Sequence, residues 1–470
     1  LALFLLAACA QSSRAQTALD AYIAKPDASY GYSLVRTVSG SGYTGYVLDM
    51  TSQTWRDPTE ITNRTEWQHY VSITKPDVLR SNTAILFISG GSNGLAAPTG
   101  VNASIALATG AVTVELQTVP NQPLQFAGES FGRSEDAIIA KTFRKFLDGG
   151  DDEWPLLLPM TKSAVRAMDT AQDYLAGQGV AIDDFFVTGA SKRGWTTWLT
   201  AAVDERVSAI APLVIDVLNI DEQMAHHRRV YEETTERIVG GYAEAIADYV
   251  AEDVLGNLES PRGQELLASV DPYEYRDRLD MPKYLVHSTG DQFFVPDSSQ
   301  LYFGDLIGPT YQRYVPNTDH GLNAGAVFGV LNFYTAVTQD AVLPEFSWTI
   351  AGDGASIAVD TVDAPESVRL WQATNPEGRD FRRDTFGAGW TSSTLDEVGD
   401  GQYLAEVTVP PTGATAFMVE LVYDVAGNPI TFTTDISVVQ VPEPGTCVLA
   451  LLAAVAAFPA AAWRCRRGAP

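Results

Sequence analysis

The sequence contains little cysteine, little positive charge and little histidine. Only three cysteines occur among 470 residues, and all of them (Cys9, Cys447 and Cys465) lie in the terminal segments. We therefore expect a folded body without disulfides, which is stabilised by packing alone. Lys and Arg number 31 against 58 Asp and Glu, which gives a formal net charge of −27. This balance disfavours nucleic acid and anionic membrane surfaces as partners.

The N-terminal segment predicts export. Residues 1–10 are almost entirely apolar and precede a polar run, as expected for a secretory signal peptide over residues 1–15. Ser13 and Ala15 provide the small residues of a cleavage site. The run that ends in Cys9 also resembles a bacterial lipoprotein signal, so acylation of Cys9 is the alternative.

The C-terminal segment, residues 441–470, has the order of a sorting tail. A Pro-Glu-Pro triplet precedes an apolar stretch, residues 448–463, and three arginines follow it. The stretch is just long enough for a transmembrane helix, and the arginines would keep its end in the cytoplasm. The pattern resembles the PEP-CTERM sorting signal, which implies an exosortase-type processing enzyme as a partner. It places the body outside the cytoplasm of a Gram-negative-type bacterium, secreted or on the cell surface, with a permanent tail anchor as the alternative.

The body between these ends predicts an α/β fold over residues 20–345. Apolar strand patterns alternate with helical spacing, which favours a parallel sheet with helices on both faces. Residues 221–281 interrupt this alternation with a charged, helical stretch, which we expect to form a cap over the active edge. From residue 346 to 440, short alternating runs predict a small antiparallel β-sandwich.

The individual elements follow from the same patterns. The strands expected in the first part are residues 40–50, 66–73, 84–88, 111–119, 206–215 and 284–287, and the helices are residues 135–147 and 161–177. The strands expected in the sandwich are residues 346–350, 367–371, 403–409, 416–422 and 430–438.

The most informative segment runs from Phe185 to Gly194. An apolar strand enters Gly189-Ala190-Ser191, and a helix-forming stretch follows at once. This order predicts a strand–turn–helix elbow with a nucleophilic Ser191 at its apex, because a turn so tight needs small neighbours. The strict motif is Gly-x-Ser-x-Gly. Here Arg193 occupies the last place, and the glycine comes one residue later.

A nucleophilic serine needs a base and an acid that orients the base. In α/β-hydrolases these partners follow the serine in the order acid, then histidine. Asp291 and His320 each come after an apolar strand, and we predict them as the acid and the base. Asp216, Asp297 and Asp319 are the alternatives for the acid.

The other four histidines fit the role of base less well. His69 and His287 lie within expected strands, where a core imidazole is the better interpretation. His226 and His227 are adjacent, so on a helix they point in different directions and do not form the i, i+4 pair of a zinc site. We expect both on the cap surface, with His226 as a candidate substrate contact. The sequence predicts no metal and no cofactor.

Acyl transfer also needs donors for the developing oxyanion. The backbone N–H of Lys192 is one expected donor, because it follows the nucleophile. The second is expected from Gly91, in a glycine loop where Gly90 would let the backbone approach the substrate. Arg193 is a candidate for binding an anionic group of the substrate.

These segments together resemble the PhoPQ-activated pathogenicity-related protein family. The resemblance covers roughly residues 20–440 and is carried by residues 188–198, 212–219, 290–294, 371–376 and 379–382. It implies an α/β-hydrolase fold with Ser191, Asp291 and His320 at the triad positions, and it implies no particular substrate. The elbow from Ser191 to Gly194 is also similar to that of glucuronoyl esterases.

The sequence thus predicts a secreted or surface serine hydrolase that cleaves an ester or amide bond of an ester or peptide substrate. An esterase acting on acylated glycans is one form of this prediction. The alternative is a non-catalytic surface protein that keeps the hydrolase scaffold for binding. In either case we expect contact with a membrane only through the terminal segments.

Overall fold

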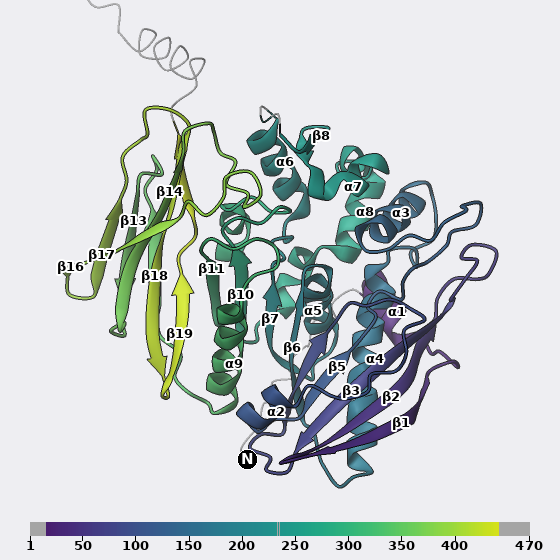
Figure 1. The fold of residues 1–470 in the computed structure, drawn as a ribbon. Helices are drawn as coiled ribbons and strands as arrows, with labels where there is room; N and C mark the ends of the chain where they lie inside the picture. Colours follow the sequence, from purple (N-terminus) through teal and green to yellow (C-terminus); the bar gives the residue numbers. More distant parts are fainter. Residues whose placement is uncertain (1–15, 233, 235, 441–470) are drawn as a thin grey trace, which may run out of the picture.

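The computed structural model describes residues 16–232, 234 and 236–440, and it is built around a nine-stranded sheet (Figure 1). The strands, in their spatial order, are β1 (Gly31–Gly40), β2 (Tyr43–Thr54), β3 (Glu66–Pro76), β5 (Thr113–Leu116), β4 (Thr83–Ile88), β6 (Asp184–Ala190), β7 (Val207–Leu213), β10 (Lys283–Ser288) and β11 (Thr310–Val315).

The sheet changes character along its width. Strands β1, β2, β3 and β5 pair antiparallel, whereas β5, β4, β6, β7, β10 and β11 all run parallel. The parallel strands are buried on both faces, as the continuous apolar runs of β4 and β6 require. This strand order is that of the α/β-hydrolase fold, so the predicted fold class is confirmed. The antiparallel edge is a departure from the purely parallel sheet that alternation suggested.

Helices cover both faces of the sheet. Helices α1 (Ala18–Ala24), α4 (Leu157–Ala176) and α5 (Lys192–Val203) pack on one face, and α2 (Ala103–Thr109) and α9 (Ala324–Thr338) pack on the other. Helix α4 buries most of its length against the sheet and α5. Each face therefore carries its own hydrophobic core.

The segment between β7 and β10 is largely helical, as predicted for a cap; we call residues 221–281 the cap segment. It contains α6 (Ile220–Tyr231), a short hairpin of β8 (Ile238–Val239) and β9 (Tyr242–Ala243), α7 (Ala247–Ala251) and α8 (Pro261–Val270), joined by the 3₁₀ turns η1 (Glu244–Ile246), η2 (Leu255–Asn257) and η3 (Pro272–Arg278). Helix α3 (Asp136–Leu147) packs against α7 and α8. Figure 1 shows these helices together above one edge of the sheet.

Residues 346–440 form two antiparallel sheets beside β11 and α9 (Figure 1). One sheet consists of β12 (Phe346–Ile350), β13 (Ser356–Thr361), β17 (Gln402–Glu406) and β16 (Glu397–Gly399). The other consists of β15 (Thr391–Thr394), β14 (Ser367–Asn375), β18 (Ala414–Val425), β19 (Asn428–Thr433) and β20 (Ser437–Gln440). The expected single strand at 430–438 is two strands, with the non-strand residues 434–436 between them.

Asp435 joins this C-terminal module to the central sheet. Its carboxylate accepts hydrogen bonds from Ser299 Oγ at 2.6 Å, in the 3₁₀ turn η4 (Ser298–Leu301), and from Gln312 Nε2 at 2.8 Å, in β11. It also accepts one from Trp348 Nε1 at 3.0 Å, in β12. One carboxylate thus satisfies donors from three elements, and the aromatic contacts of Tyr311 with Phe432 complete the junction.

Within the described residues, no helix has both the length and the apolar character to cross a membrane. The expected transmembrane stretch, residues 448–463, and the expected signal peptide lie outside those residues.

We expect Asp435→Ala to lower the free energy of unfolding by about 2–4 kcal/mol, because it leaves buried donors without an acceptor. Denaturant unfolding followed by tryptophan fluorescence measures this loss. The matched control is Asp424→Ala, which removes an exposed carboxylate from β18. Equal stability of the two variants would contradict the role assigned to Asp435.

Candidate active site

The parallel strands bring the predicted site residues to one edge of the sheet. Ser191 follows β6, Asp291 follows β10 and His320 follows β11. Parallel strands end at the same edge, which is where α/β sheets bind their ligands. The three residues are far apart in the sequence, and this edge brings their loops together.

Ser191 occupies the strained turn that the sequence predicted. Its backbone has φ 59° and ψ −129°, a region that costs a non-glycine residue about 1–3 kcal/mol. Its N–H donates to Leu213 O at 2.8 Å, which ties the turn to β7. A Cβ on Gly189 would lie 2.7 Å from Arg193 O, and one on Gly194 would lie 2.6 Å from Ile215 Cγ2. Gly194, the displaced glycine of the motif, therefore has no room for a side chain at its position.

Asp291 and His320 form a hydrogen-bonded pair. His320 Nδ1 lies 3.0 and 2.9 Å from the two carboxylate oxygens of Asp291. Asp291 is buried and also accepts the N–H of Phe293 at 2.8 Å, while Gln292 Oε1 accepts the N–H of His320 at 3.0 Å. A carboxylate on Nδ1 orients the ring and leaves Nε2 with the lone pair that a general base needs.

The Nε2 atom of His320 is buried, and no described residue gives it a hydrogen bond. The ring of Phe293 links this imidazole to the serine turn. It lies 4.4 Å from the His320 ring and 6.0 Å from Lys192 Nζ, and it lines the same pocket as Ser191. Contacts between a nucleophile and its base are often long before substrate binds.

The alternative acids are engaged elsewhere. The Asp216 carboxylate accepts from Tyr314 OH at 3.0 Å and faces His287 Nδ1 at 3.5 Å. Burial raises the pKa of Asp216, and the group belongs to a core network. Asp319 is exposed and accepts the N–H of Gly321 in a turn.

The third alternative, Asp297, joins the cap segment to the C-terminal module. It pairs with His226 Nε2 at 2.9 Å and with Arg379 Nη2 at 2.6 Å. The Nε2 of His226 is thus committed to a structural carboxylate and is not turned to the pocket as a substrate contact. His227 was expected on the surface but is buried between Tyr231 and Tyr242, and burial lowers its pKa to about 3.

The loop at residues 376–390 of the C-terminal module also supports the segment that carries Asp291, the predicted acid. Arg383 N donates to Gly290 O at 2.8 Å, directly before Asp291. Arg382, paired with Asp380, donates to the backbone carbonyls of residues 236 and 237 in the cap segment. The second module therefore holds both the acid loop and the cap segment.

Arg193 has a different role from the predicted one. Its Nε donates to Val119 O at 2.5 Å, and its two terminal nitrogens bind the carboxylate of Glu135 at 2.7 Å each. The guanidinium lies under Gly90, where an added Cβ would come within 2.7 Å of Nη2. A substrate anion would have to displace Glu135, so Arg193 connects the elbow to the glycine loop instead.

Sequence reasoning missed Glu135 and the residue that follows it. Glu135 has a strained backbone, φ 56° and ψ −131°, at the start of α3. Lys192 Nζ lies 3.0 Å from Glu135 and 2.8 Å from Asp136, and Tyr249 OH donates to Asp136 Oδ1 at 3.0 Å. Neither acid stands in a motif, and only the tertiary structure brings them beside the serine.

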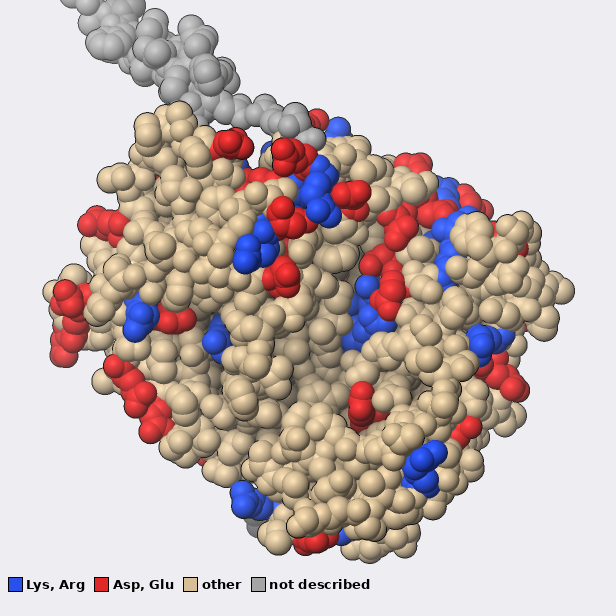
Figure 2. All heavy atoms as spheres, in the orientation of Figure 1, with Lys and Arg blue, Asp and Glu red and all other residues tan. Residues whose placement is uncertain are grey.

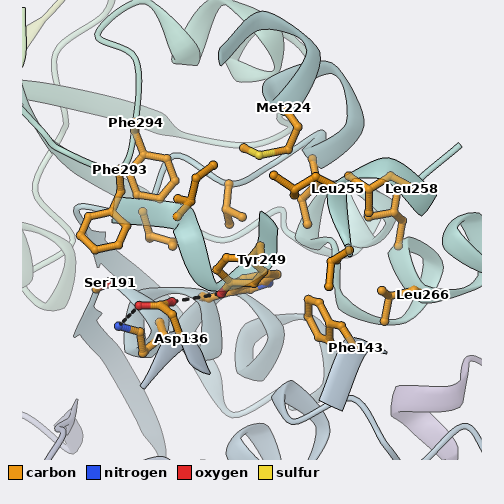
Figure 3. Close-up of a pocket in the computed structure, with 18 residues that line it drawn as sticks. Asp136, Phe143, Ser191, Met224, Tyr249, Leu255, Leu258, Leu266, Phe293 and Phe294 are labelled. Atoms are coloured by element: carbon orange, nitrogen blue, oxygen red, sulfur yellow. Dashed lines mark hydrogen bonds and ion pairs between the residues drawn. The ribbon is translucent and has the colours of Figure 1, made fainter. Parts of the chain in front are cut away.

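A pocket opens between the elbow and the cap segment (Figure 3). Ser191 and Asp136 lie at one end, with Phe293 and Phe294 beside them. Lys192, the ion-pair partner of Asp136, lines the pocket as well. The rest of the wall is mostly apolar and comes from α3, α5, the cap segment and residues 215–220 between β7 and the cap segment. Gly90 and Gly91 line a separate hollow on the far side of their loop, so their part in an oxyanion site stays a prediction.

No group of three or more His, Cys, Asp or Glu side chains in the described ranges is arranged to hold a metal ion. On the face shown in Figure 2, acidic and basic side chains gather around a central hollow. Close to the serine, Lys192 and Arg193 likewise pair with Glu135 and Asp136, so that positive and negative charges offset one another.

The model of the PhoPQ-activated pathogenicity-related protein family matches residues 19–382. The chain belongs to this family. This PhoPQ-related chain is also similar to the autocrine proliferation repressor protein A of Dictyostelium discoideum, at 33% identity over 465 residues and 92% of each chain. Residues 440–467 match the PEP-CTERM protein-sorting motif, which suggests export and surface association in bacteria.

Solved structures similar to this family member include esterases. Acetyl xylan esterase 1 from Thermoanaerobacterium sp. JW/SL YS485 matches 67% of this chain and 91% of its own, with a TM-score of 0.45 and 16% identity. A glucuronoyl esterase from Solibacter usitatus matches 60% of this chain and 76% of its own, with a TM-score of 0.34 and 15% identity. The fold is established here by the strand order and the family.

Glu135→Gln tests the charge cluster through its pH dependence. Burial alone would raise the Glu135 pKa, but the hydrogen bond and charge of Arg193, with Lys192, lower it to about 2 from 4.5. A lowered carboxyl pKa stabilises the fold above the unfolded pKa, and this stabilisation is lost as pH falls through the folded pKa. We expect the wild type to have the higher Tm near neutral pH, and the difference to shrink between about pH 4.5 and pH 2.

Thermal unfolding at a series of pH values measures this difference. The exposed Glu406→Gln in β17 serves as the control and should show no such convergence. A Tm difference for Glu135→Gln that stays constant over the window would contradict the assignment.

Proposed function

We propose that this member of the PhoPQ-related family is a serine hydrolase that cleaves an ester or amide bond through an acyl-enzyme. The observation that carries the proposal is the combination of a strained Ser191 at the elbow with the Asp291–His320 pair at the same sheet edge. Backbone strain of this kind is retained where surrounding structure enforces it, and it clusters at active sites.

The reaction follows from the roles of these groups. Ser191 Oγ attacks the substrate carbonyl while His320 Nε2 takes the hydroxyl proton, and Asp291 stabilises the imidazolium that forms. The backbone N–H of Lys192, at the start of α5, would donate to the oxyanion, with Gly91 as the second donor. The imidazolium then protonates the leaving oxygen or nitrogen. Water, activated by the same histidine, releases the acyl group and restores the serine.

The sorting motif supports a place of action outside the cytoplasm. An exported chain would meet its substrate in the periplasm or at the cell surface of a Gram-negative-type bacterium, after processing by an exosortase-type enzyme at the C-terminal motif. The strongly acidic body supports neither nucleic acid nor an anionic lipid surface as the substrate.

A fluorophosphonate probe tests the nucleophile directly. We expect covalent labelling of the purified body at Ser191, because the probe captures a serine activated by a general base. Ser191→Ala should abolish the label, and Ser393→Ala, an exposed serine in β15, should retain it. Intact protein mass and peptide mapping measure the adduct. A folded wild type without label would favour the non-catalytic binding protein.

Substitution of the acid tests its assignment. Asp291→Asn should lower kcat by about ten-thousandfold, because an amide no longer orients the imidazole or stabilises its charged form. The matched control is Asp319→Asn, which alters an exposed carboxylate one residue before His320 and should leave kcat within about threefold of the wild type. Rates of ester hydrolysis at neutral pH measure both. Similar rates for the two variants would remove Asp291 from the mechanism.

A further inference from the structure

The pocket beside Ser191 points to the chemical class of the substrate. We propose that the substrate is an ester of an apolar acyl group longer than acetyl, which enters the pocket beneath the cap segment. This inference rests on the proposed function, because the pocket selects an acyl group only if Ser191 is acylated. It goes further, since neither the elbow nor the triad specifies what is bound.

The wall of the pocket consists of hydrocarbon over most of its surface. Phe143 of α3 and Trp195 of α5 form one part, and Leu255, Leu258 and Leu266 of the cap segment form another. Figure 3 shows the leucines at the end away from Ser191. Most of these side chains are buried, so the far end of the pocket lies inside the protein. Apolar surface of this kind binds an apolar group by removing both from water.

The polar side chains in the wall are already bonded to the protein. Asp136 holds both Lys192 Nζ, at 2.8 Å, and Tyr249 OH, at 3.0 Å. Trp195 Nε1 donates to Val270 O at 2.6 Å. Because the rest of the wall is apolar, a sugar or a charged acyl group in this pocket would lose its hydration and find few hydrogen-bond partners, which is costly. The pocket therefore disfavours the polar substrates that an elbow of this type could otherwise accept.

The closed end of the pocket suits the acyl side of the ester. The acyl group becomes attached to Ser191 in the first half of the reaction and stays there until water attacks, whereas the alcohol must leave before that attack. A group enclosed by the cap segment cannot leave as readily as one that faces the loops of Gln292 and Asp319, where the surface is more open. We accordingly assign the enclosed pocket to the acyl chain.

A series of p-nitrophenyl esters from acetate through butyrate, hexanoate and octanoate to dodecanoate tests the proposal. We expect kcat/KM to rise by about fourfold for each methylene that the pocket buries, and to fall once the chain exceeds the pocket. The preferred ester should carry an acyl chain longer than that of acetate. A parallel series of acetate esters of straight-chain alcohols should show little dependence on chain length.

Two substitutions shorten the pocket. Leu255→Trp and Met224→Trp each add bulk to a partly buried position in the wall and should lower the octanoate-to-butyrate ratio of kcat/KM at least tenfold. Leu404→Trp, in the exposed part of β17, is the matched control and should leave the ratio unchanged. Circular dichroism verifies that each variant is folded. If one pocket variant does not fold, the other carries the test.

The outcomes separate this inference from the proposed function. The acyl pocket is overturned if the protein is labelled by fluorophosphonate but acetate is the best substrate. It is also overturned if neither pocket variant alters the octanoate-to-butyrate ratio of kcat/KM. Both results leave the serine hydrolase intact. A chain-length preference confined to the alcohol series would assign the pocket to the leaving group and overturn the proposal. If the protein shows neither labelling nor turnover of any ester, the proposed function is overturned, and the inference falls with it.

Discussion

The close approach of helix α5 to the ends of β6 and β7 is the constraint on which the site depends. Gly189 and Gly194 face each other across this contact, and a side chain at either would overlap the backbone or Ile215. The contact forces the intervening Ser191 into a backbone conformation that serine otherwise avoids. It also places the N-terminus of α5, with its N–H groups and positive dipole, next to the serine hydroxyl.

Ion pairs extend this constraint to the surrounding loops. Arg193, two residues beyond the serine, fills the space under Gly90 and binds Glu135 at the start of α3. Lys192 reaches Glu135 and Asp136 from the same end of α5. The glycine loop, the elbow and α3 are thereby held as one body. Because α3 packs on α7 and α8, the position of the cap segment over the pocket depends on the same pairs.

The C-terminal module performs the corresponding task for the loop that carries Asp291. Arg383 holds the backbone of Gly290, and Arg379 reaches Asp297 and, through it, His226 of the cap segment. A loop some 90 residues downstream of Asp291 thus helps to determine where the carboxylate lies. The module is joined to the sheet by the Asp435 carboxylate and by aromatic packing on α9, so its contribution to the site is carried by a buried junction.

Sequence patterns predicted the elements whose burial is simple. The continuous apolar run of β4 and the amphipathic spacing of α3 were located within a few residues of their observed bounds. Strand β1 was missed because it lies at the exposed edge, where few positions are buried. Helix α9 was missed because it is apolar on most of its faces, including the exposed positions Val327 and Phe328, and so lacks a clear amphipathic pattern. Periodic patterns in the sequence reveal an element when one of its faces is buried and the other is exposed, and neither β1 nor α9 has this pattern.

The sequence by itself determined the serine elbow, the order Ser191, Asp291 and His320 along the chain, and the change from an α/β region to a β-rich module. These features follow from the local spacing of residue types and from chain order, neither of which depends on contacts between distant segments. The tertiary structure alone decided that Arg193 binds Glu135, that His227 is buried, and that an apolar pocket lies beside Ser191. Each of these depends on which segments meet in space, because the partner of a charge and the depth of a pocket are set by residues far away in the chain.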